Sequence, residues 1–287
     1  MAMTHRRVHR MMYSLLLLSL LPLLPRTADG FGELKPTVRN TNLCRTDLCS
    51  TQATHVGCIK TKDFAPNCGK GNHIIFVNGG LRQRMLQSIN IMRNYVASGA
   101  GNFSVAGRMP TMGWDRNLEL LASLLVRQCD EKARFCSNTE KYHYVATTQL
   151  SGTMAQNGKV ANLVMNKLLP SLYIDLLGCR MDKYHKLQPL SEGSCVGHYV
   201  PLIQDNGNRM GCAIRIRADA NATISLNLLC HFSRANVNNN PHYEVATIPG
   251  EMCSSGKSKI YRFLCDRIEQ VDANTIGDDE VTGGQFS

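Results

Sequence analysis

The sequence predicts a disulfide-rich α+β domain in which helices come first along the chain and a β-hairpin follows. Helical periodicity in the first half, period-two alternation near residues 212–231 and twelve cysteines lead to this prediction. The 287 residues are enough for one large domain or two small ones, and 43% hydrophobic residues exclude a wholly disordered chain. No stretch after residue 30 is apolar for long enough to cross a membrane.

Residues 1–30 are predicted to be a secretory signal peptide. Three arginines fall within the first twelve residues, eight of the twelve residues 13–24 are leucine, and Ala28 and Gly30 form a small-x-small cleavage site. The alternative is a membrane anchor, but Pro22 and Pro25 leave an apolar run too short for about 30 Å of hydrocarbon. We therefore expect cleavage and no transmembrane anchor.

All twelve cysteines follow this segment, which predicts six disulfides formed in an oxidising compartment. Metal binding is the alternative, but the sequence lacks a C-x2-C pair, which argues against a zinc ribbon or finger. Asn102 and Asn221 begin Asn-x-Ser/Thr sequences and are candidate glycosylation sites. The cysteines are Cys44, Cys49, Cys58, Cys68, Cys129, Cys136, Cys179, Cys195, Cys212, Cys230, Cys253 and Cys265.

The N-terminal part of the mature chain, residues 31–80, has four cysteines and little periodicity, and we expect a loop-rich segment. The pattern then changes. Apolar residues recur every three or four positions from Leu81 to Val96, which predicts a helix over residues 81–97 that ends at Ser98-Gly99.

Two further helices are predicted in the middle of the chain. Residues 117–129 carry an apolar stripe, and Asp115 is suited to be the N-cap. A third helix is expected from about residue 159 to residue 169, where Pro170 would stop it. Residues 171–178 are compatible with a short additional helix.

A hairpin is the clearest signal in the second half of the chain. Cys212, Ile214 and Ile216 alternate with more polar neighbours, and a second alternating run ends at Cys230, so the two cysteines could pair across the strands. The predicted domain comprises residues 81–235. We expect residues 236–287 to form an extension with a loop closed by Cys253 and Cys265 and an acidic tail.

Five short motifs stand in order along the chain. They are the N-terminal cysteine segment from Asn42-Leu43-Cys44 to Pro66-Asn67-Cys68-Gly69, Gly113-Trp114-Asp115, Gly197-His198-Tyr199, Gly211-Cys212, and Leu229-Cys230-His231-Phe232. Together they resemble the CAP superfamily of cysteine-rich secretory, antigen 5 and pathogenesis-related proteins. The resemblance covers about residues 40–235 and is greatest to antigen 5-related, venom allergen-like proteins of flies.

The resemblance implies a three-layer α-β-α sandwich, which agrees with the helix-then-hairpin order. It also implies the disulfides Cys44–Cys58, Cys49–Cys136, Cys68–Cys129 and Cys212–Cys230, leaving Cys179 with Cys195 and Cys253 with Cys265.

Many members of the family have a cleft with two histidines and two glutamates, which could bind a metal or transfer protons. Here Ile89 stands at the first histidine position, Thr147-Thr148-Gln149 replaces the first glutamate motif, and no acid occurs between Lys141 and Ile174. Only His198 is retained. We therefore expect no catalytic residue, metal or cofactor. His143 and His231 are the candidates for a rearranged site, but we interpret both as exposed or strand-end polar residues.

The predicted function is a secreted, non-enzymatic protein that binds an extracellular partner, with saliva, venom or reproductive fluid as settings the family implies. A carrier of sterol or another small lipid is the alternative, in which Met85 and Met92 could line a groove or simply pack the core. A hydrolase using His198 is the weaker alternative. Basic residues are scattered despite a net charge of +10, which argues against nucleic acid and indicates mild attraction to acidic surfaces. The partner and the oligomeric state stay open.

Overall fold

The computed structural model describes residues 42–59, 63–130, 133–181, 187–189, 200–219, 222–235 and 241–275. All of them belong to a single compact unit that begins at Val38. The predicted signal peptide, Cys195, His198 and Asn221 lie outside the described residues.

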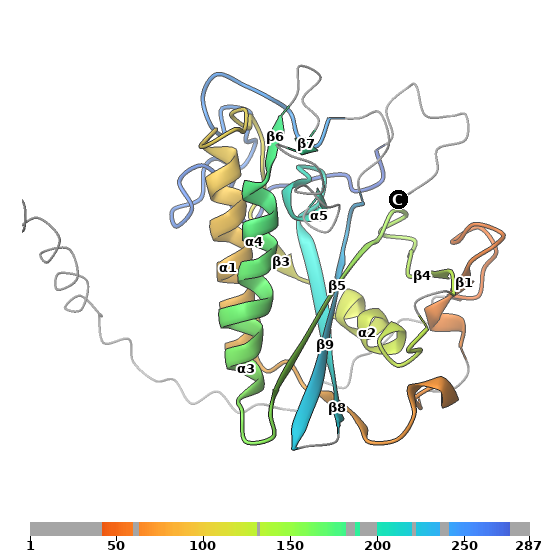
Figure 1. The fold of residues 1–287 in the computed structure, drawn as a ribbon. Helices are drawn as coiled ribbons and strands as arrows, with labels where there is room; N and C mark the ends of the chain where they lie inside the picture. The colour runs from red at the N-terminus through yellow and green to blue at the C-terminus, as the bar shows by residue number, and fades with distance from the viewer. Residues whose placement is uncertain are drawn as a thin grey trace, which may run out of the picture. The chain divides into compact units, whose positions relative to one another are not determined.

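The described chain forms three layers, which confirms the predicted α-β-α sandwich (Figure 1). Helix α1 (Gly79–Ala97) runs beside a helical rod made of α3 (Val160–Leu163), a π-helical turn η3 (Val164–Leu168) and α4 (Leu169–Leu177). Helix α2 (Arg116–Leu125) covers the opposite face of the sheet.

The central sheet has the order β2-β8-β9-β5, with β3 paired in parallel to β8. The long strands are antiparallel neighbours, and Cys212 lies opposite Cys230 in the predicted hairpin. Strand β5 was not predicted. The bounds are β2 Asn72–Ile75, β3 Gly113–Trp114, β5 Ala146–Ala155, β8 Arg209–Ala218 and β9 Thr223–Phe232.

Alternation along the hairpin separates two cores. Cys212, Ile214 and Leu228 point into the larger core, which they share with α1 and the helical rod. Ala213 and Leu229 point the other way and pack against Ala122 and Val126 at α2. The period-two alternation of the sequence thus corresponds to two faces that pack into different cores.

The first two helices begin at polar caps. The Asn78 side chain accepts a hydrogen bond from the Leu81 amide at the start of α1, and Asp115 caps α2 as predicted. Helix α2 ends at Leu125, four residues before the predicted end. The chain then turns into Cys129, whose φ of 49° is left-handed and so cannot continue a helix.

The prediction that Pro170 ends the third helix is wrong. Helical structure continues from Val160 to Leu177, and Pro170 is the second residue of α4. The π-helical turn directly before it shifts the hydrogen-bond register and lets the chain pass without a break.

Short elements complete the fold around the sandwich. They are β1 Thr54–His55, which pairs with β4 Phe135–Cys136; β6 Cys179–Met181, which pairs with β7 Leu187–Pro189; α5 Val200–Ile203; and the 3-10 turns Val56–Cys58 and Pro66–Cys68. Tyr243 and Leu264, from the predicted extension, are buried in the same core as α1. The domain boundary at residue 235 stays a prediction.

Five disulfides match pairs considered from the sequence, and no described cysteine is free. Cys179 is also disulfide-bonded, and its expected partner, Cys195, lies outside the described residues. Within the described part of the chain, no helix has the length and apolar character needed to span a bilayer. The five pairs are Cys44–Cys58, Cys49–Cys136, Cys68–Cys129, Cys212–Cys230 and Cys253–Cys265.

Candidate functional site: an apolar cleft position and its supporting residues

Ile89, which the family resemblance implies stands at the first cleft-histidine position, lies on helix α1. The Ile89 side chain has no solvent exposure and lies in the main hydrophobic core, where Met85, one turn earlier on the helix, is also fully buried. An isoleucine offers neither a metal ligand nor a proton-transfer group. The helix therefore contributes only packing at this position.

The next residue, Asn90, joins α1 to the loop before β3. Its side-chain oxygen accepts a hydrogen bond from the Met112 amide at 2.7 Å, and its side-chain nitrogen donates to the Met112 carbonyl at 3.0 Å. The Asn90 side-chain amide therefore pairs with the backbone N–H and C=O of one loop residue, as a neighbouring strand would, and its role is structural.

Arg93 lies one turn further along α1 and is completely buried. Its guanidinium donates to the carbonyls of Pro110 (3.1 and 2.8 Å), Gln204 (3.1 Å), Gly207 (3.2 Å) and Leu202, so all five of its N–H groups have partners. The side chain thereby joins α1 to two loops. We call Asn90 and Arg93 the α1 hub.

Burial determines the electrostatics of this hub. Desolvation lowers the pKa of Arg93 to about 9, and the Asp205 carboxylate offsets part of that effect. For the acid Asp205, the same burial raises the pKa, because it disfavours the charged carboxylate. The 2.8 Å hydrogen bond that Asp205 accepts from the Glu244 amide lowers this pKa in part. A guanidinium with every donor satisfied and no solvent access positions loops and has no free group for substrate.

The segment that replaces the first glutamate motif lies on β5. Thr148 is 2% exposed and pairs with Cys230, so it faces the layer that contains α1, because directly paired residues share a face. Thr147 and Gln149 face the α2 side. On the helical rod, Val164 and Leu168 are buried apolar residues. These positions therefore provide no carboxylate.

The histidines considered as substitutes lie in different environments. His143 is exposed, whereas His231 on β9 is fully buried with its Nδ1 atom 3.0 Å from the Thr147 hydroxyl. Burial lowers the pKa of His231 to about 4; the carbonyls of Ala146 and Leu121 oppose this shift and His55 adds to it. His231 is thus neutral near pH 7. Its position one residue before the end of β9 fits a strand-end residue, but its complete burial was not expected.

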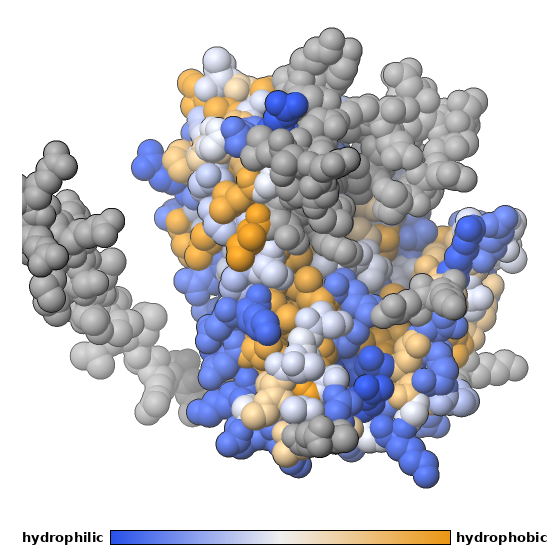
Figure 2. Space-filling model, viewed as in Figure 1, coloured by the Kyte–Doolittle hydropathy of each residue, from blue (hydrophilic) through white to orange (hydrophobic). Residues whose placement is uncertain are grey.

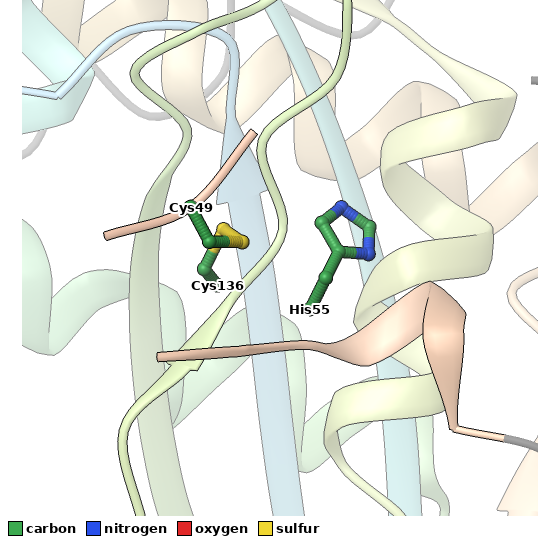
Figure 3. A group of neighbouring side chains, drawn as sticks. All are labelled: Cys49, His55 and Cys136. Carbon is green, nitrogen blue, oxygen red and sulfur yellow. A yellow bond between two sulfur atoms is a disulfide. The ribbon is translucent and has the colours of Figure 1, made fainter. Parts of the chain in front are cut away.

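One group of described side chains has the spacing of a metal site, and sequence reasoning missed it. Cys49, His55 and Cys136 place their ligand atoms within 4.8 Å of one another (Figure 3). The two sulfurs are joined as a disulfide and so are not thiolate ligands. The ring nitrogens of His55 are also occupied, by the Gly57 amide at 3.0 Å and the Asn138 carbonyl at 2.6 Å. This group is a structural cluster.

Two adjoining hollows lie on the α2 side of the sheet. One, of about 500 Å³, is lined by Leu125, Val126 and Leu229 together with Arg215 and other polar residues. The other, of about 760 Å³, is lined by the 50–53 and 133–138 segments and by His143. Both are open at the surface and mix apolar with polar groups, which is a composition that small-ligand sites share.

The remaining predicted site residues can be placed only in part. Asn102 is exposed in a turn after α1, a position that an attached glycan could occupy. Asn221 and His198 lie outside the described residues.

The three-layer sandwich, the disulfide pairs and the α1 hub define a CAP-type domain. No family model matches the sequence. The antigen 5 like allergen Cul n 1 of Culicoides nubeculosus is 32% identical over 186 residues, which are 62% of this chain and 84% of that protein.

Venom allergen-1 of Aedes albopictus is 27% identical over 244 residues, 82% of this chain and 91% of that protein. A crystal structure of NaASP2 with Zn2+ matches with a TM-score of 0.49 and 21% identity, over 66% of this chain and 96% of that one. By its likeness to the Culicoides protein, the chain belongs to the antigen 5 family of the CAP superfamily.

Proposed function

We propose that this chain is a secreted, non-enzymatic antigen 5-type protein that acts by binding an extracellular partner. The observation that carries the proposal is that Ile89, which the resemblance implies replaces the first cleft histidine, is fully buried in the hydrophobic core. A buried isoleucine is incompatible with a ligand there, and two glutamate positions are also lost from the sequence.

The chemistry of the remaining residues supports a non-enzymatic role. A catalytic zinc is held by three protein ligands, and general acid–base catalysis needs a donor and an acceptor of protons within reach of the substrate. His198 alone offers one imidazole. Asn90 and Arg93 are engaged with backbone groups, so their retention reflects the fold.

Secretion is supported by three independent features. The first thirty residues have the composition of a signal peptide, the described cysteines are all in disulfides, and relatives are named as allergens. A rigid scaffold with many disulfides presents its loops in fixed positions, which suits recognition of a partner.

The carrier alternative loses part of its motivation in the structure. Met85 and Met92, which could have lined a groove, are both buried in the main core. Their side chains fill space between α1 and the sheet.

The test is a calorimetric zinc titration of the tag-free mature protein, residues 31–287, combined with peptide and ester hydrolysis assays. We expect neither turnover nor stoichiometric binding with a Kd below about 1 µM, equivalent to about −8 kcal/mol. His198→Ala is the matched control and should change nothing. Tight zinc binding or turnover that disappears in His198→Ala would show a rearranged catalytic site and refute the proposal.

A further inference from the structure

Exposed apolar side chains gather in the C-terminal part of the domain. Four of the exposed large hydrophobic residues fall within residues 248–268, and Ile260 is 82% exposed, the highest value among those described. The space-filling view shows hydrophobic residues in separate patches between hydrophilic areas on the face drawn (Figure 2). The four residues are Ile248, Met252, Ile260 and Ile268.

Ile260 stands at the tip of a loop closed by the Cys253–Cys265 disulfide. The Ser258 hydroxyl accepts hydrogen bonds from the amides of Ile260 (3.3 Å) and Tyr261 (3.2 Å), and the Ser258 amide donates to the Leu264 carbonyl at 2.8 Å. The tip is therefore a hydrogen-bonded turn, and its isoleucine is held outward by a fixed backbone.

The base of the loop is fastened to the core. The Phe263 amide donates to the Asn94 side chain on α1 at 3.0 Å, and the Cys265 carbonyl accepts from the Thr111 hydroxyl at 2.6 Å. Leu264 has no solvent exposure. A loop fixed in this way loses little conformational entropy when it binds.

Three cations lie in the same loop as Ile260, and one of them, Lys257, pairs through its backbone with Cys265 at the base. Lys257, Lys259 and Arg262 are exposed, and no acid occurs between Cys253 and Cys265.

The acids that flank the loop lie outside its tip. Glu269 is buried and accepts hydrogen bonds from the Ser254 and Ser255 amides at the base of the loop, Asp266 accepts from the Ile268 amide, and Glu251 accepts from the Thr247 amide. Residues 257–262 themselves contain three cations and no acid, so this segment carries positive charge around one apolar side chain.

We propose that this tip, residues 257–262, docks on an anionic phospholipid surface, with Ile260 below the headgroups and the three cations on the phosphates. The inference rests on the proposed binding function and names its partner. A protruding side chain needs a matching pocket on a protein, whereas fluid lipid closes around any convex shape. Basic residues beside an apolar anchor are the combination by which proteins bind anionic membranes.

The test measures co-sedimentation of the mature protein with phosphatidylcholine vesicles, with and without phosphatidylserine, at low salt. Replacing Lys257, Lys259 and Arg262 by glutamine should weaken binding to the anionic vesicles about 100-fold, since each cation contributes about fivefold. The control replaces Lys70, Arg84 and Lys167, which are also exposed, by glutamine; it has the same change in net charge and should retain most of the binding.

The apolar contribution is tested by Ile260→Ser, which should weaken binding about tenfold. Ile174→Ser on α4 is the control, because Ile174 is also highly exposed but lies outside the loop. An Ile260→Trp variant adds a direct readout: its fluorescence should be quenched by brominated lipid tails.

Three results would overturn the proposal. They are no binding of the unsubstituted protein to anionic vesicles, equal losses in the loop variant and its charge control, or binding to polyglutamate without binding to vesicles, which would indicate an acidic protein partner. If the vesicle experiment fails but the protein shows neither zinc binding nor turnover, the membrane proposal is wrong and the proposed non-enzymatic binding function is unaffected. Zinc-dependent turnover would refute that function whatever the vesicles show.

Discussion

The buried imidazole of His231 should make the free energy of unfolding depend on pH. Its folded-state pKa is about 4, below the value of about 6.5 expected in the unfolded chain. Between these pH values the unfolded state binds more protons, so acid favours unfolding. The stabilising effect is fully present above pH 6.5 and is lost as the pH falls through 4.

The pKa difference gives the magnitude. With a folded-state pKa of about 4, the linkage between protonation and unfolding removes roughly 3 kcal/mol of the free energy of unfolding between pH 7 and pH 4. The pKa of buried His55 is also lowered by desolvation, so its contribution has the same sign.

The perturbation is His231→Gln, which removes the titrating group and keeps a polar atom for the Thr147 hydroxyl. Guanidinium unfolding of the disulfide-intact protein, followed through the single tryptophan at several pH values, measures it. At pH 7, His231→Gln is expected to be less stable than the unsubstituted protein. Between pH 7 and pH 4, its free energy of unfolding should fall by about 3 kcal/mol less than that of the unsubstituted protein. His143→Gln, at an exposed histidine, is the control and should follow the unsubstituted protein. Parallel pH profiles for His231→Gln and the unsubstituted protein would refute the reasoning.

Two further predictions concern packing. Arg93→Met should lower the free energy of unfolding by about 3–5 kcal/mol, because it leaves several buried carbonyls without donors. Arg93→Lys should recover only part of this stability, and a loss below about 1 kcal/mol for Arg93→Met in the same denaturation assay would exclude the hub role. Gly211→Ala should lower the free energy of unfolding by about 1–3 kcal/mol, because the added Cβ would lie 2.2 Å from the Glu119 amide nitrogen. Gly79→Ala is the control: its Cβ would enter open space, so the variant should be as stable as the unsubstituted protein or more stable. Equal shifts of the melting temperature in the two variants would contradict this reasoning.

Periodicity in the sequence predicted those elements in which apolar residues mark a face. The stripe from Leu81 to Val96 predicted α1, and the alternation around Cys212 and Cys230 predicted the hairpin and the pairing of these two cysteines. Strand β5 was missed because Thr147, Gln149 and Ser151 alternate with residues that are only partly apolar. Hydrogen bonding to β9 along its whole length, rather than side-chain hydrophobicity, defines this strand.

For the candidate site, the sequence could predict only that a residue cannot bind metal or transfer a proton, because its side chain lacks the required group. Ile89 is recognisable as a non-ligand from its chemistry alone, and the structure adds that it is fully buried. The partners of Arg93 lie up to 114 residues away and are backbone carbonyls, which leave no signature in sequence. The contact of His55 with the Cys49–Cys136 disulfide likewise depends on tertiary folding.

The sequence separation between paired cysteines determines the order in which the disulfides can form during synthesis. Cys44 and Cys58 are 14 residues apart, and Cys212 and Cys230 are 18 apart, so each pair is complete soon after its first member is synthesised. Cys49 must wait for Cys136, 87 residues later, which takes about 4–17 s at synthesis rates of about 5–20 residues per second. During that interval Cys58, Cys68 and Cys129 are synthesised as well, and Cys49 can meet any of them that is not yet paired. Maturation of the N-terminal segment therefore favours transient wrong pairs and depends on disulfide isomerisation, whereas the central hairpin can acquire its bond locally.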